Sequence, residues 1–229
     1  MVSLALPTSG IRLSLGEFDP AINASFDNLP PDNHLESRFM FRRRRYSLCR
    51  YFAGELKWLP PIPFLQAAEH NPLAAGRPRP FHSLRSATRQ AVASKIIPTL
   101  TAQLPSDEFT VGVHQIRIVA NDEYMGKPAP EGIHRDGFDF VAVIAVARSN
   151  VNGGVTILVD RDNYNDVLFE DTLERGAAIL FDDRNVAHYT TPITPRYPGA
   201  ASRDVFVLTF SMAQQDLGVQ ERVSSHATS

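Results

Sequence analysis

The sequence predicts a mainly β protein with flanking helices, in which the second half of the chain forms a sandwich or barrel of antiparallel strands. Three observations lead to this prediction. From residue 109 onward, about seven short segments rich in β-branched residues alternate with turn residues. No convincing helical pattern interrupts them, and one segment with helical spacing precedes them. Hydrophobic residues make up 43% of the 229 residues, as in globular domains.

The N-terminal part is less regular. Residues 1–40 are predicted to form loops and one helix, and residues 46–52 a strand that follows four consecutive arginines, Arg42 to Arg45. These arginines suit a solvated edge, although alternate ones can turn inward towards an anionic ligand. A connection rich in Pro, Asn, Ala and Gly covers 59–81, and apolar residues at helical spacing predict a helix over 83–97. Pro98 ends or bends this helix, or a second short segment continues to Leu104.

The predicted strands of the second half are bounded by turn residues such as Asn152-Gly153-Gly154. The segment 138–147 is apolar enough to be buried on both faces. The strands are expected over residues 109–120, 138–147, 155–159, 167–170, 177–181, 186–190 and 204–210.

The length suits one domain over residues 1–229. We expect an N-terminal α/β elaboration over 1–105, a β core that carries the functional site over 106–215, and a flexible tail over 216–229.

Charge and composition exclude several classes of protein. The net charge of −2 and the pI of about 6.4 argue against binding to nucleic acid or to an anionic membrane. With one cysteine, Cys49, no disulfide can form within the chain, and no apolar segment has the length of a membrane span. We therefore expect a cytoplasmic protein, with a homodimer as an open possibility. Phosphate-binding glycine loops, a serine elbow and a C-x-x-C motif are absent from the sequence.

A metal-binding pattern lies just before the segment 138–147. His134 and Asp136 are two residues apart at the end of a strand, so both side chains point to one face. His188 lies on a later predicted strand and can supply a third ligand. Two histidines and one carboxylate form the facial triad of non-haem Fe(II) oxygenases, which leaves positions for a bidentate cosubstrate and dioxygen. Zinc favours four-coordination and lacks redox chemistry.

A 2-oxo acid that chelates iron through one end needs a cation for its far carboxylate. Arg203 opens the last predicted strand, and its planar guanidinium can donate two parallel hydrogen bonds to a carboxylate. Arg196 is the competing candidate, but it lies in a loop between prolines. We prefer Arg203 because a strand fixes the direction of its side chain.

The stretch Pro130-Glu-Gly-Ile-His-Arg-Asp-Gly-Phe-Asp-Phe140, followed by Arg148-Ser-Asn-Val-Asn-Gly-Gly154, resembles the bacterial family of 2-oxoglutarate/Fe(II) dioxygenases that includes L-isoleucine 4-hydroxylase. The resemblance covers about residues 109–212. It implies a double-stranded β-helix (jelly-roll, cupin-like) core and hydroxylation of a free aliphatic amino acid. It also implies that His134, Asp136 and His188 bind Fe(II).

The same resemblance implies that Arg203 binds 2-oxoglutarate. One position departs from the wider superfamily, in which a serine often follows the arginine two residues on, because Val205 stands there. The missing hydrogen bond would have to come from Thr209, Tyr124 or another residue.

An amino acid substrate needs a cation for its carboxylate and an acceptor for its ammonium group. Gln115 and Arg117 share one face of the predicted strand 109–120 and can point into the barrel together, which places His114 on the other face in a structural role. A solvent-exposed or ion-paired Arg117 is an equally strong alternative. Glu131, just before the first iron ligand, is the candidate acceptor for the ammonium group.

These expectations combine into a hydroxylase of an isoleucine-, leucine- or methionine-like L-amino acid. It would use Fe(II), 2-oxoglutarate and O2, with ascorbate as reductant in vitro, and release succinate and CO2. Two alternatives stay open. The same cofactors can hydroxylate, desaturate or cyclise a larger biosynthetic intermediate, and a jelly-roll can act as a non-catalytic binding module.

Overall fold

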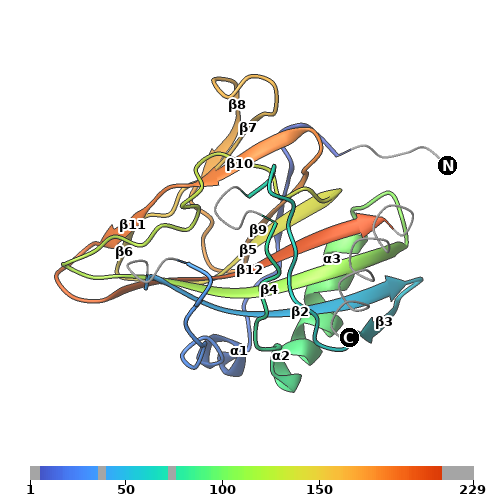
Figure 1. Cartoon of the computed structure of the whole chain (residues 1–229), viewed down its shortest axis with the longest axis horizontal. Helices are drawn as coiled ribbons and strands as arrows, with labels where there is room; N and C mark the ends of the chain where they lie inside the picture. Colours follow the sequence, from blue (N-terminus) through green and yellow to red (C-terminus); the bar gives the residue numbers. More distant parts are fainter. Residues whose placement is uncertain (1–5, 36–39, 72–75, 213–229) are drawn as a thin grey trace.

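The computed structural model describes residues 6–35, 40–71 and 76–212. The predicted tail over 216–229 lies outside these residues. The protein is built on a seven-stranded antiparallel sheet, with helices on one face and shorter strands above the other (Figure 1). The prediction of a mainly β jelly-roll with flanking helices is confirmed. In the described part of the chain, no helix is long and apolar enough to cross a membrane.

The main sheet combines strands from both halves of the chain, and every neighbouring pair is antiparallel. The N-terminal part therefore contributes to the sheet itself as well as to its cover. In spatial order the strands are β1 (Ile11–Ser14), β9 (Ala177–Asp182), β5 (Phe140–Ser149), β12 (Ala201–Met212), β4 (Glu108–Ala120), β2 (Arg42–Phe52) and β3 (Glu55–Trp58).

Shorter strands form the second layer of the jelly-roll. They are β10 (Val186–Thr190), β7 (Thr156–Asp160) and β8 (Val167–Asp171) in one sheet, and β11 (Ile193–Pro195) and β6 (Val151–Gly153) in another. The predicted bounds of β10 are met, whereas β1, β3, β6 and β11 were not predicted. These four strands have three or four residues each, too few for a period-two pattern to stand out.

The helices cover the face of the main sheet that is turned away from β10 (Figure 1). They are α1 (Pro20–Ala24), α2 (Ser86–Ala91), the π-helical η1 (Val92–Ile96) and α3 (Ile97–Thr101). The predicted helix over 83–97 thus continues past Pro98. Pro98 falls in the first turn of α3, where its missing N–H is tolerated, directly after the π-helical turn.

Alternation along the strands divides the interior into two apolar regions. In β5, Ala142 and Ile144 pack towards the helices, while Val141 and Val143 pack towards the second layer. This strand is buried on both faces, as its apolar sequence predicts. The helix-side core also contains Phe26, whose ring meets that of Phe206 edge-on with centroids 5.2 Å apart.

Phe26→Ala should lower the free energy of unfolding by about 3–5 kcal/mol, because it leaves a cavity between the α1 segment and the main sheet. Phe26 is 0% exposed, whereas Phe52, at the end of β2, is 58% exposed. Phe52→Ala is therefore the matched control and should change stability by less than about 1 kcal/mol. Urea denaturation followed by circular dichroism measures both values. Equal losses in the two variants would contradict this account of the core.

Candidate metal centre and cavity

Two histidines far apart in the sequence meet through their backbones. His188 lies in β10, and His134 lies in the loop between β4 and β5. The His134 N–H donates to the His188 carbonyl oxygen at 3.0 Å, and the His188 N–H donates back at 2.8 Å. This antiparallel bridge places both side chains on one side, with ring centroids 4.3 Å apart.

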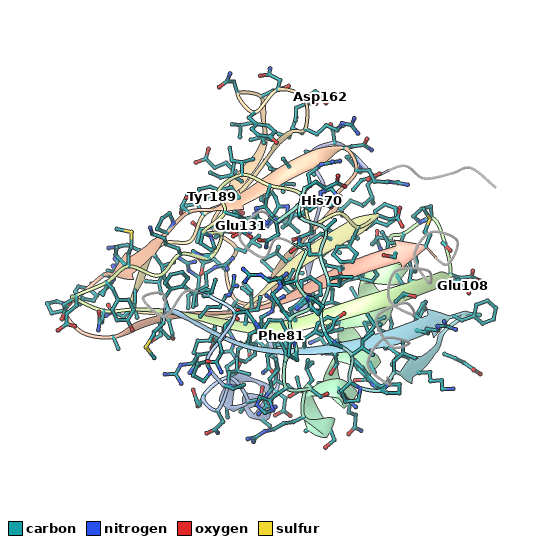
Figure 2. All side chains as sticks on the ribbon, viewed as in Figure 1. His70, Phe81, Glu108, Glu131, Asp162 and Tyr189 are labelled. Atoms are coloured by element: carbon teal, nitrogen blue, oxygen red, sulfur yellow. The ribbon has the colours of Figure 1, made fainter. Side chains whose placement is uncertain are left out.

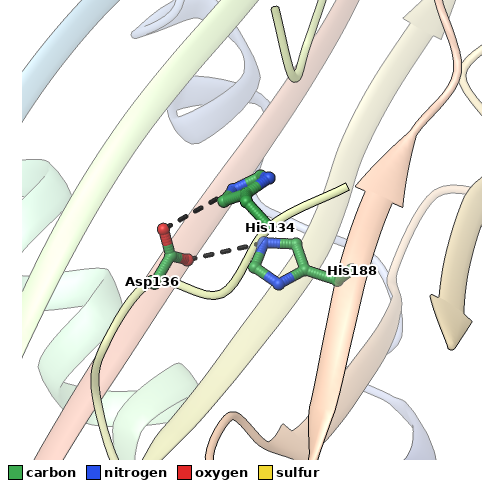
Figure 3. Close-up of side chains that lie close together, drawn as sticks. All are labelled: His134, Asp136 and His188. Atoms are coloured by element: carbon green, nitrogen blue, oxygen red, sulfur yellow. Dashed lines mark ion pairs between the residues drawn. The ribbon is translucent and has the colours of Figure 1, made fainter. Parts of the chain in front are cut away.

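Asp136 completes a group of three possible metal ligands (Figure 3). Its Oδ1 lies 3.7 Å from Nε2 of His134, and its Oδ2 lies 3.5 Å from Nε2 of His188. One ligand atom from each residue falls within 4.8 Å of the others. Two imidazole nitrogens and one carboxylate oxygen, gathered from one strand and one loop, suit a divalent iron ion with open coordination positions.

The remaining ring nitrogens of the histidines face away from the metal position. Nδ1 of His134 donates to the carbonyl oxygen of Gly132 at 2.9 Å, so the lone pair of the neutral ring is on Nε2. Nδ1 of His188 has no hydrogen-bond partner among the described residues, but Oδ1 of Asp183 lies 3.7 Å from it. A carboxylate behind a ligating histidine orients the ring and raises its basicity.

Asp183 also shapes the loop that carries Asp136. Its carboxylate accepts the backbone N–H groups of Asp136, Gly137 and Phe138 at 3.1, 2.7 and 3.1 Å. Gly137 has a φ of +84°, and a Cβ there would overlap the ring of His70, so glycine is required at this turn.

A second contact holds the Asp136 side chain. The Gln66 amide donates to Oδ1 of Asp136 at 2.9 Å and to its carbonyl oxygen at 3.1 Å. The Gln66 oxygen in turn accepts from Arg79 at 3.0 Å. These contacts fix the amide orientation, since nitrogen faces the carboxylate and oxygen faces the cation.

The pKa values of His188, His134 and Asp183 are shifted in different directions by their surroundings. Burial and the neighbouring His134 lower the pKa of His188 to about 3, so this ring is neutral and ready to bind a cation. Burial opposes protonation of His134, but Asp136 and Glu131 outweigh it and raise the pKa of that ring. Burial, followed by the charge of Asp136, raises the pKa of Asp183 to about 8.

A cavity lies between this centre and the main sheet. In Figure 2 the labelled Glu131 lies between β10 and the main sheet. The residues that line the cavity are Arg42, Arg44, Phe64, Gln66, Asn71, Arg79, His114, Ile116, Ile118, Pro128, Ala129, Glu131, His134, Asp136, Val143, His188, Thr190, Arg203, Val205, Val207 and Thr209.

Arg203 lines this cavity and is 2% exposed. Its Nε and Nη2 have no hydrogen-bond partner within the described residues. Burial, followed by the nearby Arg148, lowers the pKa of Arg203 to about 10, which leaves it charged at neutral pH. A buried guanidinium with free donors fits an anion that binds from outside the chain. Arg196, by contrast, is exposed and stands over the ring of Tyr197.

The predicted substrate residues separate into two groups. Glu131 lines the cavity, with Oε1 3.4 Å from Nε2 of His134. Gln115 and Arg117 lie on the opposite, helix-facing side of β4, so the expectation that they point into the barrel is corrected. Gln115 donates to Ser25, and Arg117 pairs with Asp204 at 2.7 Å and with Asp27 at 2.8 Å.

His114, assigned a structural role from the sequence, is on the cavity face instead. The alternation of β4 was predicted correctly, but not which face meets the cavity. Val205 and Thr209 also line the cavity, whereas Tyr124 belongs to a different surface region.

Several site residues carry no signal in the sequence. Gln66 and Arg79 lie in the connection over 59–81, and an isolated antiparallel bridge joins Phe64 to Arg79. The side chains of Gln66 and Arg79 both line the cavity. Asp183 belongs to the pair Asp182-Asp183, which is typical of a turn and gives no indication of a role at the site. The arginines of β2 had a partial signal, because alternation predicted that one or two of the four could turn inward. Arg42 and Arg44 line the cavity.

Comparison with known proteins agrees with this geometry. The model of a family described as 2OG-Fe dioxygenase matches residues 23–209. The 3(1)-hydroxy-L-isoleucine 4-dioxygenase of Pantoea ananatis is 27% identical over 113 residues, which are 48% of this chain and 45% of that protein. The chain thus matches less than half the length of this curated relative.

Solved structures share the fold. A bsmA homolog from Methylobium petroleophilum superposes with a TM-score of 0.74 and 28% identity, over 84% of this chain and 80% of that one. IDO from Bacillus thuringiensis gives a TM-score of 0.68 and 18% identity, over 85% and 82% of the two chains. With the family match over most of the chain and the His-Asp-His group in its cavity, the chain belongs to the 2OG-Fe dioxygenase family.

Proposed function

We propose that this protein uses Fe(II), 2-oxoglutarate and O2 to hydroxylate an unactivated carbon of a free aliphatic L-amino acid. The observation that carries the proposal is a single cavity that combines three groups: the His-Asp-His centre, a buried guanidinium with free donors, and a carboxylate beside the centre. Family membership implies the iron, the 2-oxoglutarate and the dioxygen.

In this proposal His134, Asp136 and His188 hold the iron. Gly132 and Asp183 orient the two rings, and Gln66 holds the carboxylate. Because the contacts of Gly132 and Gln66 are already made in the protein, His134 and Asp136 need little rearrangement to bind the metal. Arg203 would hold the far carboxylate of 2-oxoglutarate.

The amino acid substrate is supported by Glu131 and by the relative from P. ananatis, which is named for a hydroxylated L-isoleucine. Glu131 is 10% exposed at its side chain and lies next to the metal-facing nitrogen of His134, where it can accept from an ammonium group. The apolar residues Ile116, Val143 and Val207 also line the cavity and suit an aliphatic side chain.

When bound, iron would activate dioxygen, which is the four-electron oxidant: one oxygen atom enters the succinate formed with CO2 from 2-oxoglutarate, and the other enters the C–H bond of the substrate. The chain contributes binding and orientation. Arg203 fixes 2-oxoglutarate at one end, Glu131 orients the substrate, and the two layers of the jelly-roll limit access of water to the reacting carbon.

An aerobic incubation with Fe(II), ascorbate and 2-oxoglutarate over a panel of free L-amino acids tests the activity. We expect succinate and one product heavier by one oxygen, both detected by mass spectrometry. His188→Ala should abolish both, because it removes a ligand, whereas His82→Ala, at an exposed histidine, should leave them unchanged. Succinate formed without any oxygenated amino acid would contradict the substrate proposed here.

Arg203→Gln should raise the 2-oxoglutarate concentration needed for half-maximal rate by more than about tenfold, since charge-assisted hydrogen bonds are lost. The exposed Arg196→Gln serves as the control for loss of one positive charge. Initial rates at varied 2-oxoglutarate measure the effect. An Arg203 variant with an unchanged 2-oxoglutarate requirement would remove Arg203 from this role.

Asp183→Asn should weaken metal binding by about 10- to 100-fold, because an amide cannot accept three backbone N–H groups as the carboxylate does and supports His188 less well. Calorimetric titration of the protein with Mn(II), a redox-stable substitute, measures the affinity. Asp162→Asn, whose side chain is 80% exposed, is the control and should bind like the wild type. Equal affinities in all three proteins would show that Asp183 does not support the centre.

A further inference from the structure

A cluster of three arginines faces the same cavity: Arg42, Arg44 and Arg79, which we call the arginine cluster. They are 8%, 6% and 5% exposed. Arg42 and Arg44 come from alternate positions of β2, and Arg79 comes from the connection between β3 and α2. Burial of a guanidinium carries a large desolvation cost unless an anion is nearby. The partners of each arginine therefore indicate what the cluster is built to bind.

Only Arg42 has a carboxylate of its own among the described residues. Its Nε lies 2.7 Å from Oδ2 of Asp32, whose side chain is fully buried. No described carboxylate lies within ion-pair distance of Arg44 or Arg79, and Nε of Arg79 has no hydrogen-bond partner in the same part of the chain. Two buried positive charges on the cavity wall are thus left without a direct counter-ion.

Neutral partners hold these two guanidinium groups in place. Arg44 donates to Nδ1 of His114 through Nε at 3.2 Å and Nη2 at 2.6 Å, and burial together with the arginines keeps the pKa of that imidazole well below its usual value. Arg79 donates to Gln66 at 3.0 Å. Both groups also stand over the ring of Phe64, with Cζ 5.1 and 4.8 Å from its centroid. These contacts fix the positions of the two guanidinium groups without pairing them directly with a carboxylate, as suits a site for a transient anion.

The arginine cluster is separated from Arg203 by strand β4. Arg44 pairs with Ile116, and Ile116 pairs with Val205, so Arg44 lies two strand spacings, about 10 Å, from the strand that bears Arg203. The apolar side chains of Ile116, Ile118 and Val205 line the cavity between them. A 2-oxoglutarate carboxylate bound to Arg203 therefore does not pair with Arg44 or Arg79, on which Asp32 and Asp136 act only from beyond ion-pair distance.

We propose that Arg44 and Arg79 form the subsite that binds the α-carboxylate of the amino acid substrate, opposite the 2-oxoglutarate position at Arg203. This inference rests on the proposed function and specifies how its substrate is recognised. Two guanidinium forks match the planar carboxylate, and Glu131 in the same cavity accepts from the ammonium group. Because Gln66 bonds both Arg79 and Asp136, the bound carboxylate is also held at a fixed distance from the metal ligands.

The test compares L-isoleucine with L-isoleucinamide, or the equivalent pair for the amino acid that the panel selects. The carboxamide keeps the planar shape but replaces the negative charge and one acceptor oxygen with a neutral NH2 donor. Binding is measured by calorimetry under argon with Mn(II) and 2-oxoglutarate present, and kcat/KM in air. The wild type should prefer the acid by about 10- to 100-fold. Arg79→Gln should reduce this preference to within about threefold, and Arg79→Lys should restore part of it.

Arg43→Gln is the matched control, because Arg43 is the exposed neighbour of Arg44 on the same strand and its loss changes the charge equally. It should keep the acid preference, and all three variants should keep the wild-type affinity for 2-oxoglutarate. If Arg79→Gln folds poorly, as judged by circular dichroism, Arg44→Lys gives the same comparison with the charge retained and the fork removed.

The outcomes separate this inference from the proposed function. Turnover of an amino acid whose preference over its amide is unchanged in the Arg79 and Arg44 variants would overturn the subsite alone. A variant that loses 2-oxoglutarate affinity instead would reassign the cluster to the cosubstrate and overturn it as well. Wild-type protein that binds 2-oxoglutarate but neither member of any amino acid pair would overturn the proposed function, and the subsite with it.

Discussion

The geometry of the candidate centre depends on two backbone hydrogen bonds that join His134 to His188. They connect the loop after β4 to β10, and so connect the main sheet to the second layer. Side chains of directly paired residues in an antiparallel bridge emerge on the same side, which brings the two rings together without any further device. The Asp183 carboxylate accepts three backbone N–H groups of the loop that follows His134, and these bonds hold Asp136 close to the two rings. Local backbone pairing therefore sets where a metal can bind.

Arginines on the two faces of the main sheet have different kinds of partner. On the helix side, the partly buried Arg117 is ion-paired with Asp204 and Asp27, as expected of a guanidinium that stabilises the fold. On the cavity side, Arg203 keeps free donors, and Arg44 is held by a neutral imidazole. Desolvation of guanidinium groups without a carboxylate partner costs stability on the cavity side, whereas ion pairs offset this cost on the helix side. That contrast is the basis for proposing that Arg203 and Arg44 bind anionic ligands.

Most of the strands could be predicted, because their β-branched residues and bounding turns are local features. β10 was predicted with its exact bounds, and β5 was recognised as buried on both faces. The short strands β1 and β3 were missed, since four residues that pair with distant partners carry little pattern of their own. The helix expected over 83–97 begins at Ser86, and the further segment allowed after Pro98 is present as α3, which ends at Thr101 and directly follows a π-helical turn.

The sequence by itself determined the mainly β fold, the His-x-Asp motif with a distal histidine, and the arginine at the start of the last strand, because each rests on local residue patterns. It also determined that His114 and Gln115 face opposite sides of β4, since side chains alternate in any strand. Only the tertiary structure decided which of these faces meets the cavity. Alternation is symmetric within a strand, and the choice is made by what packs on each face. The segment of α1 with the following Ser25 and Asp27 covers one face, and β10 with the connection bearing Gln66 and Arg79 covers the other.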